Sequence, residues 1–267
     1  MPSYAITGAS KGIGSEFVRQ LSQDPSNTVF AIVRDPSLPK LKPLASPANV
    51  HLVKGDVTDP ASILEAASRV SELSGGKLDV LIHNSNANDA ETIGYSPSQV
   101  PFDVEATKKF FDLSFQTAVY GGLWTTNAFL PLIEKGAEKK IIHISSGMAD
   151  VELIRKAGIP YTLAYAVAKA GMNVQIAKYA AELAPKGIKT LALSPGWVDT
   201  YEGPLPKPAE VVLGDEDLKA RFIKFDPDLN GMITPEESVT KQLQVIANLN
   251  EETSGSFMSQ RGLVGVY

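Results

Sequence analysis

The sequence predicts an α/β fold, a doubly wound parallel sheet of about seven strands with helices on both faces. Two observations lead to this prediction. Short apolar runs alternate with longer helical patterns along the chain, and a glycine-rich turn follows the first apolar run. Such alternation builds βαβ units, whose crossovers place helices on both faces of a parallel sheet. We therefore expect residues 1–267 to form one domain.

The apolar runs and helical patterns give the expected order of elements. Strands are predicted at residues 4–7, 29–33, 50–53, 78–83, 140–144, 188–193 and near 256–259. Helices are predicted at residues 12–23, 60–73, 102–134, 164–183, 215–225 and 235–249. The longest irregular stretches are 147–163 and 197–235. Because ligands bind at the carboxyl ends of the strands in such sheets, we expect these stretches to form the substrate walls.

The composition excludes several classes of protein. A net charge of −5 argues against nucleic acid or an anionic membrane as a main partner. The absence of cysteine excludes disulfides, thiolate catalysis and cysteine metal sites. Strand-like residues begin by Tyr4, which leaves no room for a cleaved signal peptide, and no apolar run approaches the ~20 residues that span a bilayer. We expect a cytoplasmic protein.

A tyrosine and a lysine four residues apart, Tyr165 and Lys169, form the main chemical signal of the chain. On a helix this spacing puts both side chains on one face. A tyrosine hydroxyl with its ordinary pKa of about 10 is a poor acid or base at neutral pH, and a nearby ammonium is expected to lower that pKa. The pair could then exchange protons near pH 7. Alone, such a pair is more often a solvated helix face.

A glycine-rich turn precedes the first helical pattern. It reads Gly8-Ala9-Ser10-Lys11-Gly12-Ile13-Gly14 and follows the first apolar run. Glycines at a strand–turn–helix junction let the backbone approach a pyrophosphate, which the helix N-terminus attracts. The spacing G-x-x-x-G-x-G differs from the general dinucleotide fingerprint G-x-G-x-x-G. A glycine-rich turn without a ligand is the alternative.

With these motifs and three more in the same order, the chain resembles the short-chain dehydrogenase/reductase family over essentially its whole length. The turn from Thr7 to Gly14 is similar to the family's cofactor loop, and residues 55–59 to its adenine-contacting turn. Residues 141–146 look like the strand that ends in the catalytic serine, and residues 194–200 like the segment that touches the nicotinamide. The resemblance implies a Rossmann-like fold and an NADP-dependent carbonyl reductase or ketoreductase.

The resemblance also implies the roles of individual residues. Tyr165 would give a proton to a substrate carbonyl as hydride arrives, and Lys169 would bind the nicotinamide ribose and tune the tyrosine. Ser146, in preference to Ser145, would hold the carbonyl oxygen. The expected cofactor-binding residues are Gly8, Ser10, Lys11, Gly12, Ile13, Gly14, Arg34, Asp56, Val57, Asn84, Ser85, Tyr165, Lys169, Pro195, Gly196, Val198 and Thr200.

The residues after the second predicted strand favour NADP(H) over NAD(H). An acidic residue at this place suits the ribose hydroxyls of NAD, whereas an arginine suits the 2′-phosphate of NADP. Here the strand is followed by Arg34, and Asp35 comes one residue later. Lys11 in the glycine turn adds a second cation.

Two departures from the family pattern bear on activity. The family's Asn-Asn-Ala-Gly is matched by His83-Asn84-Ser85-Asn86, which lacks the glycine. The family's helix asparagine, which anchors a water in a proton relay, is matched by Ala118. Either Gln116 or Ser114 substitutes for it, or turnover is reduced. We expect His83 to be a packed polar residue, with a catalytic base as the lesser alternative, and His143 to be core.

One further motif, in residues 226–237, fits the twelve-residue calcium loop D-x-D-x-N-G-x₅-E. Such loops normally come in pairs, and this one has a single copy. Thr234 followed by Glu237 is also a capping box for a helix start. We prefer the capping box and expect no metal site, with a structural calcium ion as the alternative.

The leading hypothesis is an oxidoreductase that transfers a hydride between NADP(H) and a small-molecule carbonyl or alcohol. The alternative is an NADP-binding protein of the same fold with little or no turnover, acting as a sensor or partner. A calcium-regulated interaction protein is a distant third. By resemblance, the chain would form a homodimer or homotetramer through the helices predicted within 102–134 and 164–183.

Overall fold

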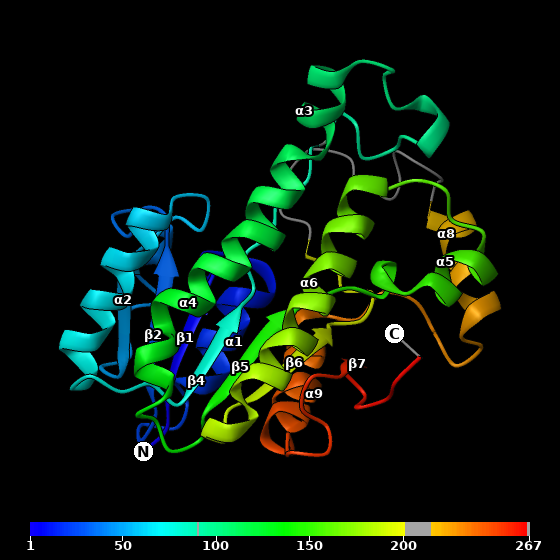
Figure 1. The fold of residues 1–267 in the computed structure, drawn as a ribbon. Coiled ribbons are helices and arrows are strands. Elements are labelled where there is room, and N and C mark those ends of the chain that lie inside the picture. Colours follow the sequence, from blue (N-terminus) through cyan, green and yellow to red (C-terminus); the bar gives the residue numbers. More distant parts are fainter. Residues whose placement is uncertain (90, 201–214, 266–267) are drawn as a thin grey trace.

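In the computed structural model, residues 1–89, 91–200 and 215–265 are described. Their strands form one seven-stranded, fully parallel sheet in the order β3-β2-β1-β4-β5-β6-β7 (Figure 1). The strands are β1 (Ser3–Thr7), β2 (Thr28–Val33), β3 (Val50–Lys54), β4 (Val80–His83), β5 (Lys140–Ile144), β6 (Lys189–Ser194) and β7 (Phe257–Ser259). The predicted Rossmann-like fold is confirmed.

Helices cover both faces of the sheet (Figure 1). On one face lie α2 (Pro60–Ser74), α4 (Gly121–Ile133) and α6 (Leu163–Leu183), whose apolar residues share a core cluster with the sheet. On the other face, α1 (Gly12–Leu21) and α9 (Pro235–Ala247) pack on the sheet in a second cluster. Near-continuous burial of β2, β4 and β5 follows from this double cover.

Two elements differ from the sequence prediction. The single helix expected over 102–134 is divided into α3 (Val104–Ser114), a π-helical turn η3 (Phe115–Tyr120) and α4. The stretch 147–163, expected to be irregular, contains α5 (Val151–Ala157). Asp150 caps the start of α5 by accepting a hydrogen bond from the Leu153 amide, and Gly158 ends the helix at φ 68°. Helix α8 (Asp215–Phe225) lies where predicted.

The strand order reverses between β1 and β4, so the crevice for a ligand is expected at the carboxyl ends of these two strands. Thr7 ends β1 and His83 ends β4, so both residues lie at this switch point. The predicted cofactor loop and the altered strand-end turn are therefore neighbours in space.

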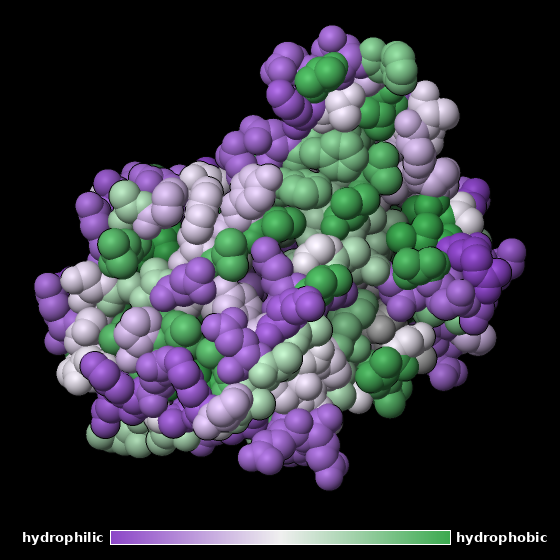
Figure 2. Space-filling model, in the orientation of Figure 1, coloured by the Kyte–Doolittle hydropathy of each residue, from purple (hydrophilic) through white to green (hydrophobic). Residues whose placement is uncertain are grey.

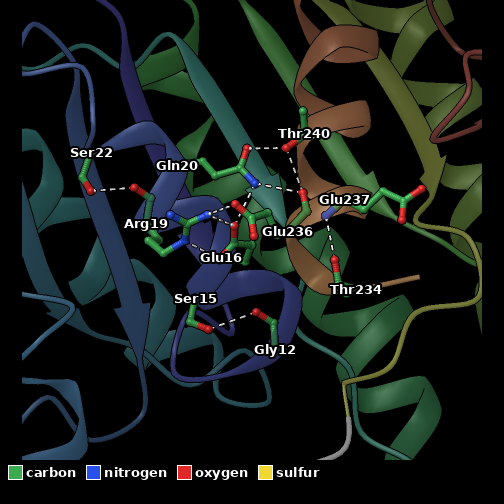
Figure 3. A network of polar contacts seen from close by, with 10 residues as sticks. All are labelled: Gly12, Ser15, Glu16, Arg19, Gln20, Ser22, Thr234, Glu236, Glu237 and Thr240. Atoms are coloured by element: carbon green, nitrogen blue, oxygen red, sulfur yellow. Dashed lines mark hydrogen bonds and ion pairs between the residues drawn. The ribbon is translucent and has the colours of Figure 1, made fainter. Parts of the chain in front are cut away.

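A polar network fixes α1 against α9 (Figure 3). Arg19 binds Glu16 on its own helix and Glu236 on α9, and Gln20 donates to the Glu236 carbonyl oxygen. Thr234 caps α9 by accepting from the Glu237 amide, which is one half of the predicted capping box, whereas the Glu237 carboxylate pairs with Lys241. Although each exposed ion pair contributes little, the network holds the helix that carries the glycine turn.

Candidate functional site

The glycine turn forms a close backbone cradle before α1. Gly8 and Gly12 have φ of 65° and 55°, which side-chain-bearing residues rarely adopt. At Gly14, a Cβ would lie 2.3 Å from the Gly8 carbonyl oxygen, so only glycine fits. Lys11 precedes α1 without a side-chain cap. The first amides of α1 thus have no side-chain cap, the arrangement that suits a pyrophosphate.

The other predicted residues of this turn lie around the cradle. Ser10 is half-buried, and Lys11 is exposed to solvent. Ile13 packs its side chain on the core beneath α1. The turn thus exposes its backbone and the Lys11 ammonium to solvent. The Ile13 side chain attaches it to the core.

The strand-end turn after β4 keeps its contacts with the glycine turn despite its unusual sequence. The Thr7 hydroxyl oxygen accepts hydrogen bonds from the Asn84 amide at 3.1 Å and the Ser85 amide at 3.2 Å. The Asn84 side chain donates to the carbonyl oxygens of Thr7 and Gly8. The two predicted cofactor residues therefore lie directly on the cradle.

Arg34 and Asp35 differ in what they contact. The Asp35 carboxylate accepts two hydrogen bonds from Ser37, through its amide at 2.9 Å and its hydroxyl at 2.6 Å. These bonds lower the pKa of Asp35 and hold its carboxylate in the local turn. Arg34 is exposed, and among the described residues it makes no ion pair. At the end of β2, the Arg34 guanidinium and not the Asp35 carboxylate is therefore the group available to bind a ligand.

The turn after β3 is rigid. The Asp56 carboxylate accepts from the amide and the hydroxyl of Thr58, and the Asp56 amide donates to the Ser62 hydroxyl. Val57 is buried, and its carbonyl oxygen lies 2.9 Å from where a Cβ on Gly121 would be. This close approach of α4 fixes the predicted adenine-contacting turn.

The segment after β6 is held from two sides. The Ser238 hydroxyl of α9 donates to the Pro195 carbonyl oxygen at 2.7 Å, and Val198 forms a β-bridge with Ile233. Gly196 has φ 84°. Thr200 reaches back to the glycine turn, because a Cβ on Gly12 would lie 3.4 Å from the Thr200 Cβ. The segment predicted to touch the nicotinamide therefore adjoins the cradle.

The two serines after β5 have different environments. Ser145 is buried and donates its hydroxyl to Asn173 at 2.6 Å. Ser146 accepts from the Met148 amide at 3.1 Å, and its hydroxyl is close enough to the Tyr165 phenol to lower the pKa of that phenol. Of the pair, Ser146 is the one beside the tyrosine, as the resemblance implied.

Tyr165 and Lys169 lie on one face of α6, but their electrostatics differ from the sequence expectation. The Lys169 Nζ lies 5.8 Å from the centre of the Tyr165 ring and donates to the Ile144 carbonyl oxygen at 2.6 Å. Burial raises the pKa of Tyr165, and the Ser146 hydroxyl opposes this. Burial lowers the pKa of Lys169 to about 7. The expected lowering of the tyrosine pKa is therefore wrong for this geometry, since burial of the phenol itself outweighs the lowering by Ser146.

Ala118 lies within η3 and is fully buried against Ala168 and Met172 of α6. Gln116 does not replace the missing asparagine, because its amide donates to Asp112 on the exposed side of the helix. Ser114 is buried in the last turn of α3. The backbone next to Ala118 is bound by His83, whose Nε2 lies 3.1 Å from the Thr117 carbonyl oxygen.

His83 and His143 are both fully buried, with ring centres 5.0 Å apart. Burial, with a smaller contribution from Lys169, lowers the pKa of His83 to about 3. The packed-residue interpretation of His83 fits this environment better than a catalytic base does. His143 contacts Thr126 of α4 through Nε2 at 2.9 Å, and its placement in the core is confirmed.

The buried histidines predict a loss of stability in mild acid. Burial lowers the pKa of His83 to about 3 and that of His143 well below its ordinary value of 6.5. Below pH 6.5 the unfolded chain binds protons that the folded protein excludes. Stability should therefore fall with pH by up to about 1.4 kcal/mol per pH unit for each histidine. Urea midpoints between pH 6.5 and 5 measure this slope.

Matched variants separate this effect from general acid denaturation. His83→Gln should remove about half of the slope, because one of two protonation events is deleted. His51→Gln, at the partly exposed third histidine, should leave the slope unchanged. Equal slopes in all three proteins would contradict the assignment.

The two stretches predicted as substrate walls contribute side chains to one apolar cluster. Leu153, Ala157, Ile159, Tyr161 and Leu218 are buried together, and Met148, Trp197, Phe222, Phe225 and Phe257 pack against them. Trp197 and Phe222 have ring centres 5.2 Å apart. Residues 201–214, which belong to the predicted wall 197–235, lie outside the described residues.

The loop 226–237 does not gather its acidic side chains. The buried Asp226 carboxylate pairs with Arg261 and accepts from the Asp228 amide. At the start of α9, the Thr234 hydroxyl accepts a hydrogen bond from the Glu237 amide. Among the described residues, no group of acidic or histidine side chains could hold a metal ion.

The fold and this arrangement define a class. A sequence profile described as short chain dehydrogenase matches residues 3–203, and the chain belongs to this family of oxidoreductases. Among its relatives, the "Short-chain dehydrogenase/reductase atnB" of an Arthrinium species is 44% identical over 268 residues, 98% of each chain. The "Short-chain dehydrogenase/reductase AacuF" of Aspergillus aculeatus is 41% identical over 266 residues, again 98% of each chain.

Among solved structures, the NADPH-bound carbonyl reductase from chicken fatty liver is similar over 100% of this chain and 99% of that chain. Its TM-score is 0.80 and its sequence identity 30%.

Sequence reasoning missed two threonines that hold the site together. Thr7 and Thr117 bind the backbone after β4 through their hydroxyls. The pattern Thr-Gly at the end of the first strand was the available signal for Thr7. Thr117 lies in a π-turn that the apolar pattern of 102–134 does not reveal.

Proposed function

We propose that this oxidoreductase transfers a hydride between NADP(H) and a carbonyl or alcohol group of a small molecule, with Tyr165 as general acid–base. The observation that carries the proposal is the grouping of three side chains, with the Ser146 hydroxyl facing the Tyr165 phenol and the Lys169 Nζ 5.8 Å from the centre of the Tyr165 ring. These residues lie at the same edge of the sheet as the glycine cradle, since they follow β5 and the cradle follows β1. NADPH in the similar chicken carbonyl reductase supports the choice of cofactor.

The residues present fit a dinucleotide. The cradle at Gly8, Gly12 and Gly14 with the start of α1 would hold the pyrophosphate. Asp56 and Val57 would face the adenine, Asn84 and Ser85 the ribose, and the segment from Pro195 to Thr200 the nicotinamide. Lys169 would exchange its bond with the Ile144 carbonyl oxygen for ribose hydroxyls. When bound, NADPH supplies the hydride.

The proton transfer follows from the tyrosine's environment. Because burial raises its pKa, Tyr165 stays protonated at neutral pH and can give its proton to the carbonyl oxygen that takes up the electron pair. The Ser146 hydroxyl donates a hydrogen bond to the same oxygen. Water then restores the tyrosine proton, and the apolar wall around Trp197 excludes solvent from the carbonyl carbon.

Oxidation of NADPH with a panel of ketones and aldehydes tests the proposal, with the alcohol product identified by mass. The protein is expected to turn over at least one carbonyl class. Tight NADPH binding without turnover on any carbonyl would favour the second candidate, a cofactor-binding protein. Ala118 and the lysine bond to Ile144 are the observations that favour that candidate.

A substitution of Arg34, at the end of β2, tests the preference for NADPH over NADH. Arg34→Ala should weaken NADPH binding by roughly 1–3 kcal/mol and leave NADH nearly unchanged, because the guanidinium would pair with the 2′-phosphate. Arg69→Ala, at an exposed arginine on α2, is the control. Titration by fluorescence measures both cofactors, and an equal loss for NADPH and NADH would refute the assignment.

We also propose that the chain forms a homo-oligomer through the face of α4 and α6. Figure 2 shows apolar side chains gathered on this side of the molecule. They include Tyr120 at 44%, Leu123 at 37%, Val167 at 41% and Val174 at 60% exposure. A face of this kind is expected to be covered by a second copy.

The mass in solution tests this association. Light scattering at micromolar concentration should give a dimer or tetramer. Val174→Lys should shift the protein toward monomer, whereas Leu64→Lys, 63% exposed on α2, should not. A monomeric wild type would overturn the proposal.

No helix in the described part of the chain is both long and apolar enough to span a membrane. The cytoplasm remains the predicted compartment on the sequence argument alone, and cell fractionation would test it.

A further inference from the structure

The backbone after β4 is held by two threonine hydroxyls from different elements. The Thr7 hydroxyl oxygen accepts from the amides of Asn84 and Ser85, and the Thr117 hydroxyl oxygen accepts from the Ala87 amide at 3.2 Å. Thr7 ends β1, whereas Thr117 lies in η3. The position of this backbone therefore depends on how the end of β1 and the π-turn are held relative to one another.

The His83 imidazole connects these two threonines. Its Nδ1 lies 3.3 Å from the Thr7 hydroxyl oxygen, and its Nε2 lies 3.1 Å from the Thr117 carbonyl oxygen. A carbonyl oxygen can only accept, so Nε2 carries the proton and Nδ1 accepts from the Thr7 hydroxyl. The hydroxyl of Thr7 already accepts two amide hydrogens, so its own proton is free for this bond.

The helix opposite the imidazole leaves room for it. At Gly122 of α4, a Cβ would lie 3.0 Å from Cε1 of His143 and 3.6 Å from Cδ2 of His83. His143 in turn contacts Thr126. A larger residue at position 122 would push the two rings apart, so α4 and the histidine pair fit one another.

The π-turn that receives the His83 bond also packs on the helix of Lys169. Ala118, next to Thr117, is buried against Ala168 and Met172, which flank the lysine. The bond from His83 thus holds η3 at the place where it supports α6.

We propose that His83 is a positioning residue that clamps the end of β1 to the π-turn, and so places both the Asn84-Ser85 backbone and the helix segment that carries Lys169. Its two arms have separate consequences. The Thr7 arm supports the backbone that would contact the cofactor, and the Thr117 arm supports the lysine. The second consequence rests on the proposed function.

Three substitutions at position 83 separate the arms. Asparagine can offer its oxygen to Thr7 but is too short to reach Thr117. Glutamine can donate its amide to the Thr117 carbonyl oxygen. Leucine fills the space and makes neither bond. His51→Gln, at a histidine stacked on Phe30 in another part of the sheet, is the control.

The variants are compared by hydrogen–deuterium exchange without cofactor, by NADPH affinity and by kcat. His83→Asn should leave the NADPH Kd within about twofold, lower kcat about tenfold and speed exchange over residues 115–121. His83→Gln should keep kcat and exchange over 115–121 close to wild type. His83→Leu should weaken NADPH binding about tenfold as well and speed exchange over residues 84–87.

The outcomes that overturn the clamp are specific. Equal effects of asparagine and glutamine on kcat and on exchange would refute the Thr117 arm. A leucine variant that binds NADPH like the wild type would refute the Thr7 arm. A wild type without any turnover would sink the proposed function, while exchange and NADPH affinity would still decide the clamp. If His83→Leu fails to fold, the contrast between asparagine and glutamine still tests it.

Discussion

Replacing Tyr165 with phenylalanine is expected to lower kcat about 100-fold or more while NADPH binding stays within about twofold of wild type. The substitution keeps the ring on α6, 5.8 Å from the Lys169 Nζ, and removes only the hydroxyl. That hydroxyl faces Ser146 and, with its pKa raised by burial, is protonated at neutral pH. Steady-state reduction of the best carbonyl substrate, with NADPH titrated separately, measures the two quantities.

The same change at a second tyrosine of α6 is the control. Tyr179 donates its hydroxyl to Asn127 at 2.7 Å, away from Ser146, and Tyr179→Phe should cost some stability and leave kcat unchanged. Wild-type carbonyl reduction by Tyr165→Phe would remove the tyrosine from the mechanism. A fall in kcat of similar size in both variants would indicate a packing effect.

The order of elements could be predicted from the sequence because each strand is a short apolar run between helical patterns. Residues 140–144 were predicted as a strand and form β5 with these bounds. The break at residues 115–120 could not be predicted, since the apolar pattern continues through it. A π-turn depends on contacts with α6 and His83, which lie far away in sequence.

Helix α5 was missed for another reason. Its seven residues are too few for a helical period to stand out within 147–163. The signals that form it are local, an aspartate cap at Asp150 and a glycine stop at Gly158. A search for caps in place of periodicity would have found it.

The residues of the candidate site could be predicted from the sequence, but their pKa values could not. The motifs could indicate that Asn84, Ser85 and Thr200 lie against the glycine turn, because strand ends of a parallel sheet meet at one edge. They did not reveal that Lys169 donates to the Ile144 carbonyl oxygen, a contact between α6 and the end of β5. Nor could they reveal its desolvation, since burial depends on all elements around the ammonium. The same holds for the raised pKa of Tyr165, because its cause is the burial of the phenol itself.

Replacing Gly14 with alanine is expected to raise the NADPH Kd about 10- to 100-fold and to lower the urea midpoint. The new Cβ would lie 2.3 Å from the Gly8 carbonyl oxygen and 2.6 Å from the Asn84 amide nitrogen. Neither atom can yield freely, because one is backbone of the cradle and the other is hydrogen-bonded to it. Overpacking of this kind costs roughly 1–3 kcal/mol.

Gly171→Ala is the matched control, because it makes the same change inside a helix with space around it. Its Cβ would lie 3.7 Å from the nearest Val119 side-chain atom, an ordinary contact. Alanine is favoured over glycine in a helix interior, so this variant should be as stable as wild type or more so, with unchanged NADPH affinity. If Gly14→Ala bound NADPH as wild type does, the cradle would not be where the pyrophosphate sits. The assignment of residues 7–14 as the cofactor turn would then fail, whatever the protein does to ketones.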